Sequence, residues 1–392
     1  MLSEKRIVLG VSGGIAAYKS VEISRRLVDA GAFVSPIMTS AAKKFIGEVT
    51  LSALASEPVK SSLWDDDDPI PHTTLGQQAD LILVAPATAK LIGTYAAGIS
   101  SDLLSATLLA TRAPVILCPA MHTEMWEHPA VQENINTLKS RGVVIVDPED
   151  GILAGGDLGK GRLAGVKAIL SEVESTLTKK DLSNLRLLIT AGGTREPIDP
   201  VRYITNKSSG KQGYALAKAA HLRGAEVTLV TTMPDDAPFG VEVLCAETAS
   251  DMRNVVMGIQ SEYDVIIMAA AIADFRPTEI SEQKIKKRKG STNLKLENTH
   301  DFLIDLGKGK RPEQTIVGFA AETEHLEENA LEKLERKHLD LIVANNVSHP
   351  GVGFSYDTNE VTIMSQDSKW TLPLSDKRII ADGILDALLE VR

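Results

Sequence analysis

Short apolar runs alternate with amphipathic stretches along the whole chain, and this alternation constrains the fold more than any other feature. Many runs are continuous in Val, Ile and Leu, as expected for strands buried on both faces of a parallel sheet. The stretches between them, such as 16–30 and 213–223, carry apolar residues at helical spacing. The pattern predicts strands at 6–11, 32–38, 80–85, 114–119, 142–147, 185–191, 226–231, 241–244, 264–269, 315–319, 340–344 and 361–364. We therefore expect doubly wound α/β domains with mostly parallel sheets.

Two domains in tandem are predicted from the length and from a polar boundary. The 392 residues correspond to about two or three ordinary domains. The two halves begin alike, with an apolar run, a Gly-Gly pair (Gly13-Gly14 and Gly192-Gly193), a helical stretch and a second apolar run. The segment between the halves is polar. We expect two Rossmann-like, flavodoxin-like domains, residues 1–175 and 185–392, joined by a linker at 176–184.

The charge balance and the lack of special segments exclude several classes of protein. The formal net charge is −10, which argues against nucleic acid as a partner because phosphate backbones select basic surfaces. Small anionic ligands need only a local cluster of positive groups. The N-terminal residues lack the apolar region of a signal peptide, and no apolar run approaches the roughly 20 residues of a membrane helix. We expect no membrane association and a cytoplasmic location.

The two cysteines, Cys118 and Cys245, each end an apolar run. They show neither zinc-binding spacing nor a disulfide framework. Because free cysteines are often buried as small apolar residues, we expect both to be buried in a reduced protein.

The most informative motif of the second half lies in the loop after its Gly-Gly pair. Residues 194–210 read Thr-Arg-Glu-Pro-Ile-Asp-Pro-Val-Arg-Tyr-Ile-Thr-Asn-Lys-Ser-Ser-Gly. Glycines after a strand let backbone N–H groups approach a phosphate at a helix N-terminus, although plain tight turns use them too. The whole string is much rarer and resembles the phosphopantothenate–cysteine ligase family. Further matches across 185–392 follow in the family's order at 269–275, 284–287, 318–323, 333, 337 and 340–346.

The ligase resemblance implies a chemistry and a set of site residues. Bacterial members activate the carboxylate of 4′-phosphopantothenate with CTP and Mg²⁺ as an acyl-cytidylate, and the cysteine amine then displaces CMP. Since the reactants are anionic, cationic donors should dominate the rate enhancement. The family pattern places Lys284 at the nucleotide phosphates, Asn206 at the acyl-cytidylate and Arg202 at the substrate. Nucleotide contacts are expected from Gly192, Gly193, Ala269, Ala270, Asp274, Lys284, Phe319, Lys333 and Lys337.

Plainer interpretations of these residues stay open from the sequence alone. The basic run 284–289 is also typical of a solvated loop. Asp274, which follows a predicted strand, is also a suitable helix cap. His300 stands where many relatives have proline, a departure from the family pattern.

The first half carries a second series of motifs. It opens with Val11-Ser12-Gly13-Gly14-Ile15-Ala16-Ala17-Tyr18-Lys19, which alone is another glycine-rich turn. Further segments follow at 38–42, 85–89, 97–103, 119–126 and 154–162. Together they resemble the flavin-containing cysteine decarboxylases, here phosphopantothenoylcysteine decarboxylase, over residues 5–165. With the ligase, this predicts two consecutive steps of coenzyme A biosynthesis on one chain.

The decarboxylase resemblance implies FMN as the cofactor, which withdraws electrons from the substrate and returns them after CO₂ has left. His72 and His122 are the candidate catalytic residues, because His transfers protons near neutral pH. A histidine such as His72, which follows the acidic run 65–68, is otherwise often only solvated. Met121 and Met125 match a substrate clamp, and Arg162 is suited to an anionic substrate. FMN contacts are expected from Gly13, Gly14, Ile15, Thr39, Thr88 and Gly98.

Three departures from the decarboxylase pattern affect the expected activity. His122 stands where most members have Asn, and Lys90 replaces the Asn that often ends the flavin loop. Gly155 stands where the family has a proton-donating Cys. Loss of a general acid typically costs about 10²–10⁴ in rate. Our hypothesis is that His122 donates the proton instead; otherwise the first half is slow, or its glycine-rich loop is a plain surface turn.

Three competing functions are weighed. The first keeps the ligase and makes the first half a degenerate scaffold. The second, a nicotinamide-dependent dehydrogenase, is weak because neither Gly-Gly turn shows Gly-x-Gly-x-x-Gly with an acidic residue about 20 positions later. The third is a non-catalytic flavodoxin-like binding module. The resemblance also implies homo-oligomers, since the decarboxylases form trimers with FMN at subunit contacts and the ligases form dimers, so that a fused chain could form a dodecamer.

Overall fold

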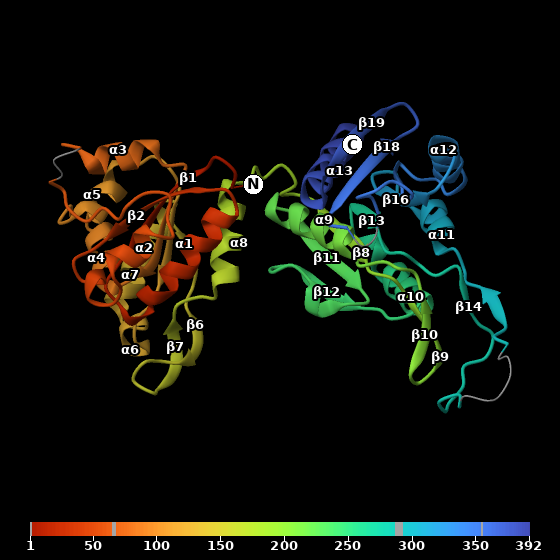
Figure 1. Ribbon diagram of the computed structural model, residues 1–392, viewed down its shortest axis with the longest axis horizontal. Helices are drawn as coiled ribbons and strands as arrows, with labels where there is room; N and C mark the ends of the chain where they lie inside the picture. Colours follow the sequence, from red (N-terminus) through yellow and green to blue (C-terminus); the bar gives the residue numbers. More distant parts are fainter. Residues whose placement is uncertain (1, 65–67, 287–292, 354–355) are drawn as a thin grey trace. The chain divides into compact units, whose positions relative to one another are not determined.

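The computed structural model describes residues 2–64, 68–286, 293–353 and 356–392 (Figure 1). The chain divides into two compact units, Met1–Lys179 and Lys180–Arg392. The division falls within the segment 176–184 that the sequence suggests as a linker, and the last helix of the first unit extends to Leu177.

The first unit is built on a parallel sheet of five strands. The strands are β1 (Arg6–Val11), β2 (Phe33–Met38), β3 (Leu81–Ala87), β4 (Val115–Pro119) and β5 (Val144–Ile145). They lie in the order β2-β1-β3-β4-β5, and Ile7 pairs with Val34 on one side and Leu81 on the other. This is the strand order of flavodoxin-like folds, in which the winding reverses between the first and third strands.

Helices cover both faces of this sheet. They are η1 (Ile15–Tyr18), α1 (Lys19–Asp29), η2 (Ala42–Lys44), α2 (Glu48–Ser52), α3 (Pro71–Gln78), α4 (Ala89–Ala96), α5 (Leu103–Ala110), α6 (Thr123–Trp126), α7 (Pro129–Ser140) and α8 (Val166–Leu177). In α1 the fully buried Ile23 and Leu27 lie one turn apart and make a single apolar face. This face packs with Ile169 of α8 on one side of the sheet, while α3, α4, α5 and α7 fill the other side.

The second unit contains a larger sheet of eight strands. These are β8 (Arg186–Ala191), β11 (Glu226–Thr231), β12 (Glu242–Cys245), β13 (Val265–Met268), β16 (Thr315–Glu322), β17 (Leu341–Asn346), β18 (Thr358–Met364) and β19 (Lys369–Asp376). Their order is β12-β11-β8-β13-β16-β17-β18-β19. The first six in this order are parallel and follow the dinucleotide-fold order 3-2-1-4-5-6, while β18 and β19 extend the sheet antiparallel.

Helices also cover both faces of the second sheet. They are α9 (Lys211–Leu222), η3 (Pro234–Asp236), α10 (Ala249–Ile259), η4 (Gln260–Glu262), α11 (Phe302–Gly309), α12 (Leu326–Arg336) and α13 (Lys377–Val391). In α13 the fully buried Ile380, Ile384 and Leu388 recur every fourth residue, and Asp376 caps the helix by accepting a hydrogen bond from the Arg378 backbone N–H. Helices α9 and α13 share one core, and α10, α11 and α12 fill the opposite one.

Short two-stranded ribbons extend from both units (Figure 1). The first unit has β6 (Glu149–Ile152) with β7 (Leu158–Arg162), and the second has β9 (Arg195–Asp199) with β10 (Arg202–Thr205) and β14 (Phe275–Pro277) with β15 (Leu296–Asn298). All three pairs are antiparallel. The last two form an arm beside the second sheet, and the first lies near the cavity of the first unit described below.

The prediction of two doubly wound α/β domains with mostly parallel sheets is confirmed. The cysteine prediction is correct for Cys118, which is buried, and wrong for Cys245, which is exposed. The reason is topological, because Cys245 ends β12, the edge strand of its sheet. Among the described residues, no helix combines the length and apolar character needed to cross a membrane.

Candidate active sites

The first unit holds a cavity of about 670 Å³ at the carboxyl ends of β1 and β3. This is where the strand order reverses, the usual ligand position of an open α/β sheet. Of the residues predicted at the flavin, Gly13, Gly14, Ile15, Thr39 and Thr88 line it, and so do Met121, His122, Met125 and Arg162 from the substrate set. The structure thus brings together residues from the ends of β1, β2, β3 and β4 and from the β6–β7 hairpin.

Two predicted residues of the first unit do not line the cavity. Gly98 lies just beyond the end of α4, where its N–H bonds the Tyr95 carbonyl, so its evident part is to end that helix. His72 lies in the first turn of α3. Its Nδ1 is buried, and no partner among the described residues reaches it. Within one chain, the structure does not bring His72 to the other candidates.

Ser12 is a cavity residue that the sequence prediction missed, although it stands inside the quoted motif. Its hydroxyl donates to the Pro86 carbonyl at 2.8 Å and accepts from the Thr88 backbone N–H at 3.0 Å. It therefore joins the loop after β1 to the loop after β3. Thr88 begins α4 without a capping bond from its own side chain, which leaves N–H groups of the first turn unsatisfied near the cavity.

The lining fits a flavin in its chemical character. The side chains of Ile15 and Met125 are 62% and 49% exposed. A flat ring bound in the cavity would cover this apolar surface. The glycine loop is also closely packed, because a Cβ on Gly13 would lie 2.3 Å from the Ala41 Cβ. Only a backbone without a side chain fits between the loops after β1 and β2. These groups would hold a planar apolar ring beside a polar, N–H-rich end.

His122 is held between two carboxylates at the cavity. Its Nδ1 lies 2.7 Å from Glu124 Oε2, and its Nε2 lies 3.4 Å from Asp157 Oδ2. The hydrogen bond to Glu124 is the main cause that raises the pKa of His122 above its ordinary value, and Asp157 adds to it. The imidazole therefore stays protonated to a higher pH than a free histidine does.

Gly155 lies directly beside this imidazole. A Cβ added there would lie 3.1 Å from His122 Nε2 and 3.0 Å from Asp157 Oδ2. The space into which a residue-155 side chain would extend is thus bordered by His122. The hairpin that carries Gly155 lies close to the His122 segment, because the Met121 N–H bonds the Gly161 carbonyl at 3.0 Å and a Cβ on Gly161 would meet the Met121 carbonyl oxygen at 2.1 Å. Only glycine permits this approach.

The second unit holds a cavity of about 720 Å³ at the carboxyl ends of β13 and β16. The predicted residues that line it are Asn206, Ala269, Ala270, Asp274, Phe319, Lys333 and Lys337. Asn206 is fixed by a hydrogen bond from its side-chain amide to the Ile272 carbonyl at 3.1 Å. His300, the departure from the family pattern, lies at the same cavity and is bound to Asp305 at 2.7 Å.

Two lysines of α12 and its end form a cationic wall of this cavity. Lys333 Nζ donates to the Phe319 carbonyl at 2.7 Å, and Lys337 Nζ lies 2.6 Å from Asp301 Oδ2. Burial lowers the pKa of Lys333, and the nearby Lys337 lowers it further. Lys337 is buried and already paired with Asp301, whereas the partly buried Lys333 is bound only to a carbonyl, so an anionic ligand would compensate its charge.

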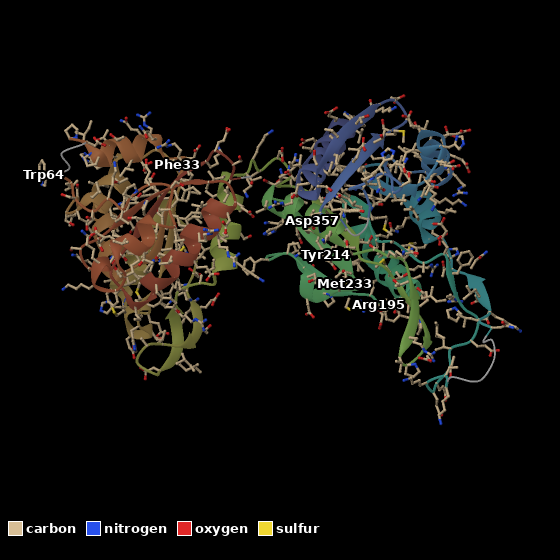
Figure 2. The ribbon with its side chains drawn as sticks, viewed as in Figure 1. Phe33, Trp64, Arg195, Tyr214, Met233 and Asp357 are labelled. Atoms are coloured by element: carbon tan, nitrogen blue, oxygen red, sulfur yellow. The ribbon has the colours of Figure 1, made fainter. Side chains whose placement is uncertain are left out.

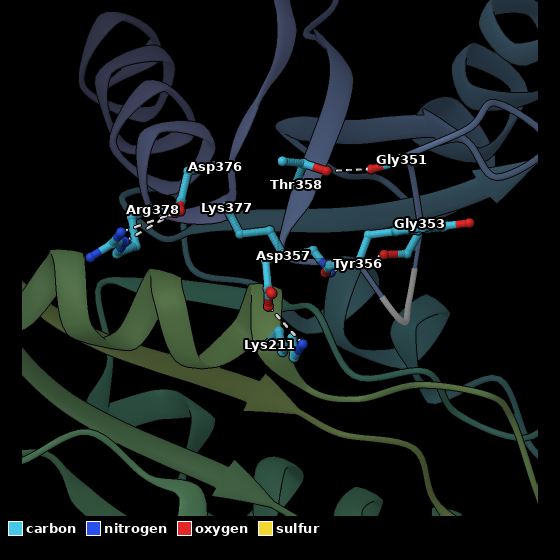
Figure 3. A network of polar contacts seen from close by, with 9 residues as sticks. All are labelled: Lys211, Gly351, Gly353, Tyr356, Asp357, Thr358, Asp376, Lys377 and Arg378. Atoms are coloured by element: carbon cyan, nitrogen blue, oxygen red, sulfur yellow. Dashed lines mark hydrogen bonds and ion pairs between the residues drawn. The ribbon is translucent and has the colours of Figure 1, made fainter.

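A second group of cations lines the same cavity, at the N-termini of α9 and α13 (Figure 3). Lys377 is almost fully buried, and its Nζ donates to the carbonyls of Gly353 at 2.9 Å and Tyr356 at 2.7 Å. Lys211 pairs with Asp357 at 2.6 Å. Burial, followed by the charge of Lys211, lowers the pKa of Lys377 to about 8. Sequence reasoning missed these lysines because neither stands in a motif with a known role.

Four predicted ligase residues are not at the cavity. Gly192 and Gly193 instead allow tight packing: Gly192 has φ +90°, and a Cβ there would lie 2.4 Å from Thr232 Oγ1. Arg202 and Lys284 lie on the arm.

The arm residues are joined to one another. Arg202 binds Asp199 and donates to the Ile285 carbonyl at 2.8 Å. This guanidinium is the main cause that keeps the pKa of Asp199 far below its usual range. Lys284 is therefore attached to the β9–β10 ribbon through its neighbour. Of the predicted basic run 284–289, residues 287–289 lie outside the described residues, as do 65–67 of the acidic run before His72.

Comparisons with known proteins divide the chain at nearly the same place as the two compact units. Residues 1–178 match the family described as Flavoprotein, and residues 182–391 match the DNA/pantothenate metabolism flavoprotein C-terminal domain. The Coenzyme A biosynthesis bifunctional protein CoaBC of Bacillus subtilis is 44% identical over 396 residues, which covers 99% of this chain and 97% of the relative.

Two further comparisons extend this result. The protein of the same name from Vibrio cholerae is 43% identical, with 99% of each chain covered. A crystal structure of the C-terminal domain of a CoaBC is similar to 54% of this chain and 96% of its own, at 40% identity and a TM-score of 0.45. The chain belongs to the family of bifunctional coenzyme A biosynthesis enzymes named CoaBC.

Proposed function

We propose that the second unit joins cysteine to 4′-phosphopantothenate with CTP, and that the first unit decarboxylates the product with FMN as its flavin. The observation that carries the proposal is the presence of two separate cavities with opposite character. One has exposed apolar side chains beside glycine-containing loops, and the other has five lysines in its lining together with a fixed amide. The first suits a flavin, and the second suits a reaction between anions.

In the ligase cavity, the cationic wall of Lys333 and Lys337 receives the nucleotide phosphates. Asn206, held by Ile272, is placed to donate to the activated carboxylate. Lys211 and Lys377 stabilise the remaining negative charge across the cavity. Mg²⁺ enters with the triphosphate, since the described residues contain no group of three or more His, Cys, Asp or Glu suited to hold a metal.

The arm acts on the cavity of a second copy. Lys284 and Arg202 do not line the cavity of their own chain, yet they are fixed to one another through Ile285. In a dimer of the second unit, the arm of one copy brings Lys284 to the nucleotide phosphates bound by the other. This would explain why Lys284, which the family pattern places at the nucleotide phosphates, lies away from the other site residues of its own chain.

In the decarboxylase cavity, the residues would hold FMN by its phosphate and ring. The flavin, when bound, supplies the reversible two-electron chemistry that lets CO₂ depart. The backbone N–H groups of the turns that follow Gly14 and Thr88 would be available to the polar groups of the flavin. Ile15 and Met125 would cover apolar surface of the ring and exclude water from it.

His122 supplies the proton that decarboxylation requires. When CO₂ leaves, the substrate keeps the bonding electron pair, and a proton must be added. Nδ1 of His122 is engaged by Glu124, so the proton comes from Nε2, the nitrogen that borders Gly155. His122 then regains its proton from solvent. The residue thereby takes over the task that a side chain at position 155 cannot perform.

His72 completes the site from a neighbouring copy. It does not line the cavity of its own chain, and its buried Nδ1 has no partner among the described residues. Trp64, which precedes α3 in the sequence, is 87% exposed (Figure 2). A trimer of the first unit would cover Trp64 and bring His72 to the next flavin cavity. Trimers and dimers together allow a dodecamer. The cytoplasmic location stays a prediction that cell fractionation would test.

The proposal is tested by mixing purified protein with 4′-phosphopantothenate, L-cysteine, CTP and Mg²⁺. Pyrophosphate, CO₂ and product mass are followed together. Pyrophosphate with CO₂ and 4′-phosphopantetheine is the expected result. Accumulation of phosphopantothenoylcysteine would reduce the first unit to a scaffold, the alternative that Gly155 favours. Absence of pyrophosphate would contradict the ligase.

A further inference from the structure

Lys19 and Arg162 form a second positively charged feature of the first cavity, apart from its glycine loop. Both residues line the cavity. Lys19 is the first residue of α1, and Arg162 is the last residue of β7. The two are brought together by a hydrogen bond from Lys19 Nζ to the carbonyl of Leu163, at 3.1 Å. A helix and a hairpin that are far apart in sequence therefore meet at a pair of cations.

The charges of this pair are poorly compensated within the chain. Among the described residues, no carboxylate lies within ion-pair distance of either side chain, and the printed hydrogen bond of Lys19 goes to a carbonyl. The nearest acids are Glu22 and Glu149. Glu149 is engaged elsewhere, because its Oε1 accepts from the Gly165 N–H at 2.7 Å. The pair thus faces the cavity with most of its donors unused.

The space around Arg162 is shaped for its guanidinium. A Cβ on Gly151 would lie 3.3 Å from both Cδ and Nη1 of Arg162. The bare backbone at Gly151 allows the side chain to lie flat along the hairpin. Burial and the charge of Arg162 lower the pKa of Lys19, the response expected where two cations share a site without an anion.

From this arrangement we propose that Lys19 and Arg162 bind a phosphomonoester at the flavin cavity. A dianion matches two cations in charge, and a planar guanidinium beside an ammonium offers several donors to its oxygens. The inference rests on the proposed decarboxylase and adds a binding site to it. The phosphate comes either from the substrate tail or from the flavin, and both offer the same group.

The test compares each phosphorylated ligand with its dephosphorylated form. The full-length flavoprotein is given phosphopantothenoylcysteine or pantothenoylcysteine, and kcat/KM is measured for wild type, Lys19→Met and Arg162→Met. The flavin-free protein is titrated with FMN and riboflavin. Lys167→Met is the matched control, since Lys167 is exposed on α8 and does not line the cavity.

If the substrate phosphate binds here, each variant lowers kcat/KM for the phosphorylated substrate about 10-fold to 100-fold and leaves pantothenoylcysteine unchanged. If the flavin phosphate binds here, FMN affinity falls by a similar factor and riboflavin affinity does not. Equal losses for both members of each pair, or no loss, overturn the inference. Lys19→Arg keeps the positive charge and should retain the preference for the phosphorylated ligand. If it does, the loss in Lys19→Met comes from the missing charge and not from misfolding. A wild type that decarboxylates neither substrate contradicts the proposed function itself.

Discussion

The two units start from the same local pattern and reach different active sites. Each has a strand, a Gly-Gly turn and a helix, and each places its cavity at the carboxyl edge of a parallel sheet. In the first unit, Gly13 and Gly14 line the cavity. In the second, Gly192 and Gly193 pack against neighbouring side chains and backbone instead. Equivalent glycines can therefore serve a ligand in one fold and packing in its neighbour.

The difference follows from what each unit adds to the shared pattern. The first adds the β6–β7 hairpin, which carries Arg162 to the cavity and places Gly155 beside His122. It leaves the electron chemistry to a flavin. The second adds α12, β18 and β19, and it supplies fixed lysines. Its cations are held by carbonyls or carboxylates, as Lys333 and Lys337 show. Function is thus set by these additions rather than by the common scaffold.

The largest effect is expected where the first unit depends on one proton donor. His122→Asn should lower kcat for phosphopantothenoylcysteine by about 10²–10⁴, the usual cost of losing a general acid. The wild-type rate should fall as pH rises through the raised pKa of His122, because only the protonated form can donate. Stopped-assay CO₂ release across pH would measure both.

A second variant separates proton donation from structure. A side chain at position 155 would press against His122 Nε2 and Asp157 Oδ2, which would have to shift. In His122→Asn the imidazole is gone, so adding Gly155→Cys places a thiol at the same spot. The double variant should recover at least part of the lost rate with a changed pH profile. If it recovers nothing while it still binds flavin, His122 is not the donor.

In the second unit, Lys333→Met should reduce ligation by about 10²–10³, since a fixed cation near developing charge is lost. Decarboxylation of supplied phosphopantothenoylcysteine should not change. Arg336→Met is the control, an exposed cation on the same helix. Pyrophosphate release measures the first activity and CO₂ the second. A parallel loss of both activities would show that the two sites are coupled and would contradict two independent cavities.

A core substitution should destabilise only the unit that contains it. Ile384 is fully buried in the core shared by α9 and α13, and Ile384→Ala should lower the unfolding free energy of the second unit by about 2–5 kcal/mol. The first unit should keep its unfolding transition, followed through flavin release in denaturant. Leu27→Ala provides the reverse experiment. One merged transition shifted by both variants would contradict independent folding.

The sequence predicts the sheets better than the ribbons. Runs such as 6–11 and 226–231 coincide with β1 and β11 because all their residues after the first are buried, which favours a run rich in Val, Leu and Ile. The ribbons give no such signal: β7 reads Leu-Gly-Lys-Gly-Arg, and β9 contains a proline. Their strands are partly exposed, so their residues are chosen for loops and close approaches rather than for a core.

Site residues are predictable where they directly follow a buried strand, and less so elsewhere. Thr88 and Ala269 stand at such ends and line their cavities. Lys284 and His72 stand on segments whose position depends on tertiary packing and on other copies of the chain. Lys377 had no local signal, since its importance arises from burial against the carbonyls of Gly353 and Tyr356. These contacts join residues far apart in sequence, which periodicity does not reveal.

The smallest predicted effect concerns Lys377 and is a change with pH in the KM of the ligase reaction. Its pKa is lowered from 10.5 to about 8, so the side chain is mostly charged below pH 8 and mostly neutral above it. An anionic substrate should bind more weakly as pH rises through 8, with KM for 4′-phosphopantothenate increasing up to about 10-fold. Lys377→Arg, which keeps its charge, should flatten the ligase profile, whereas an unchanged step would assign it to another group.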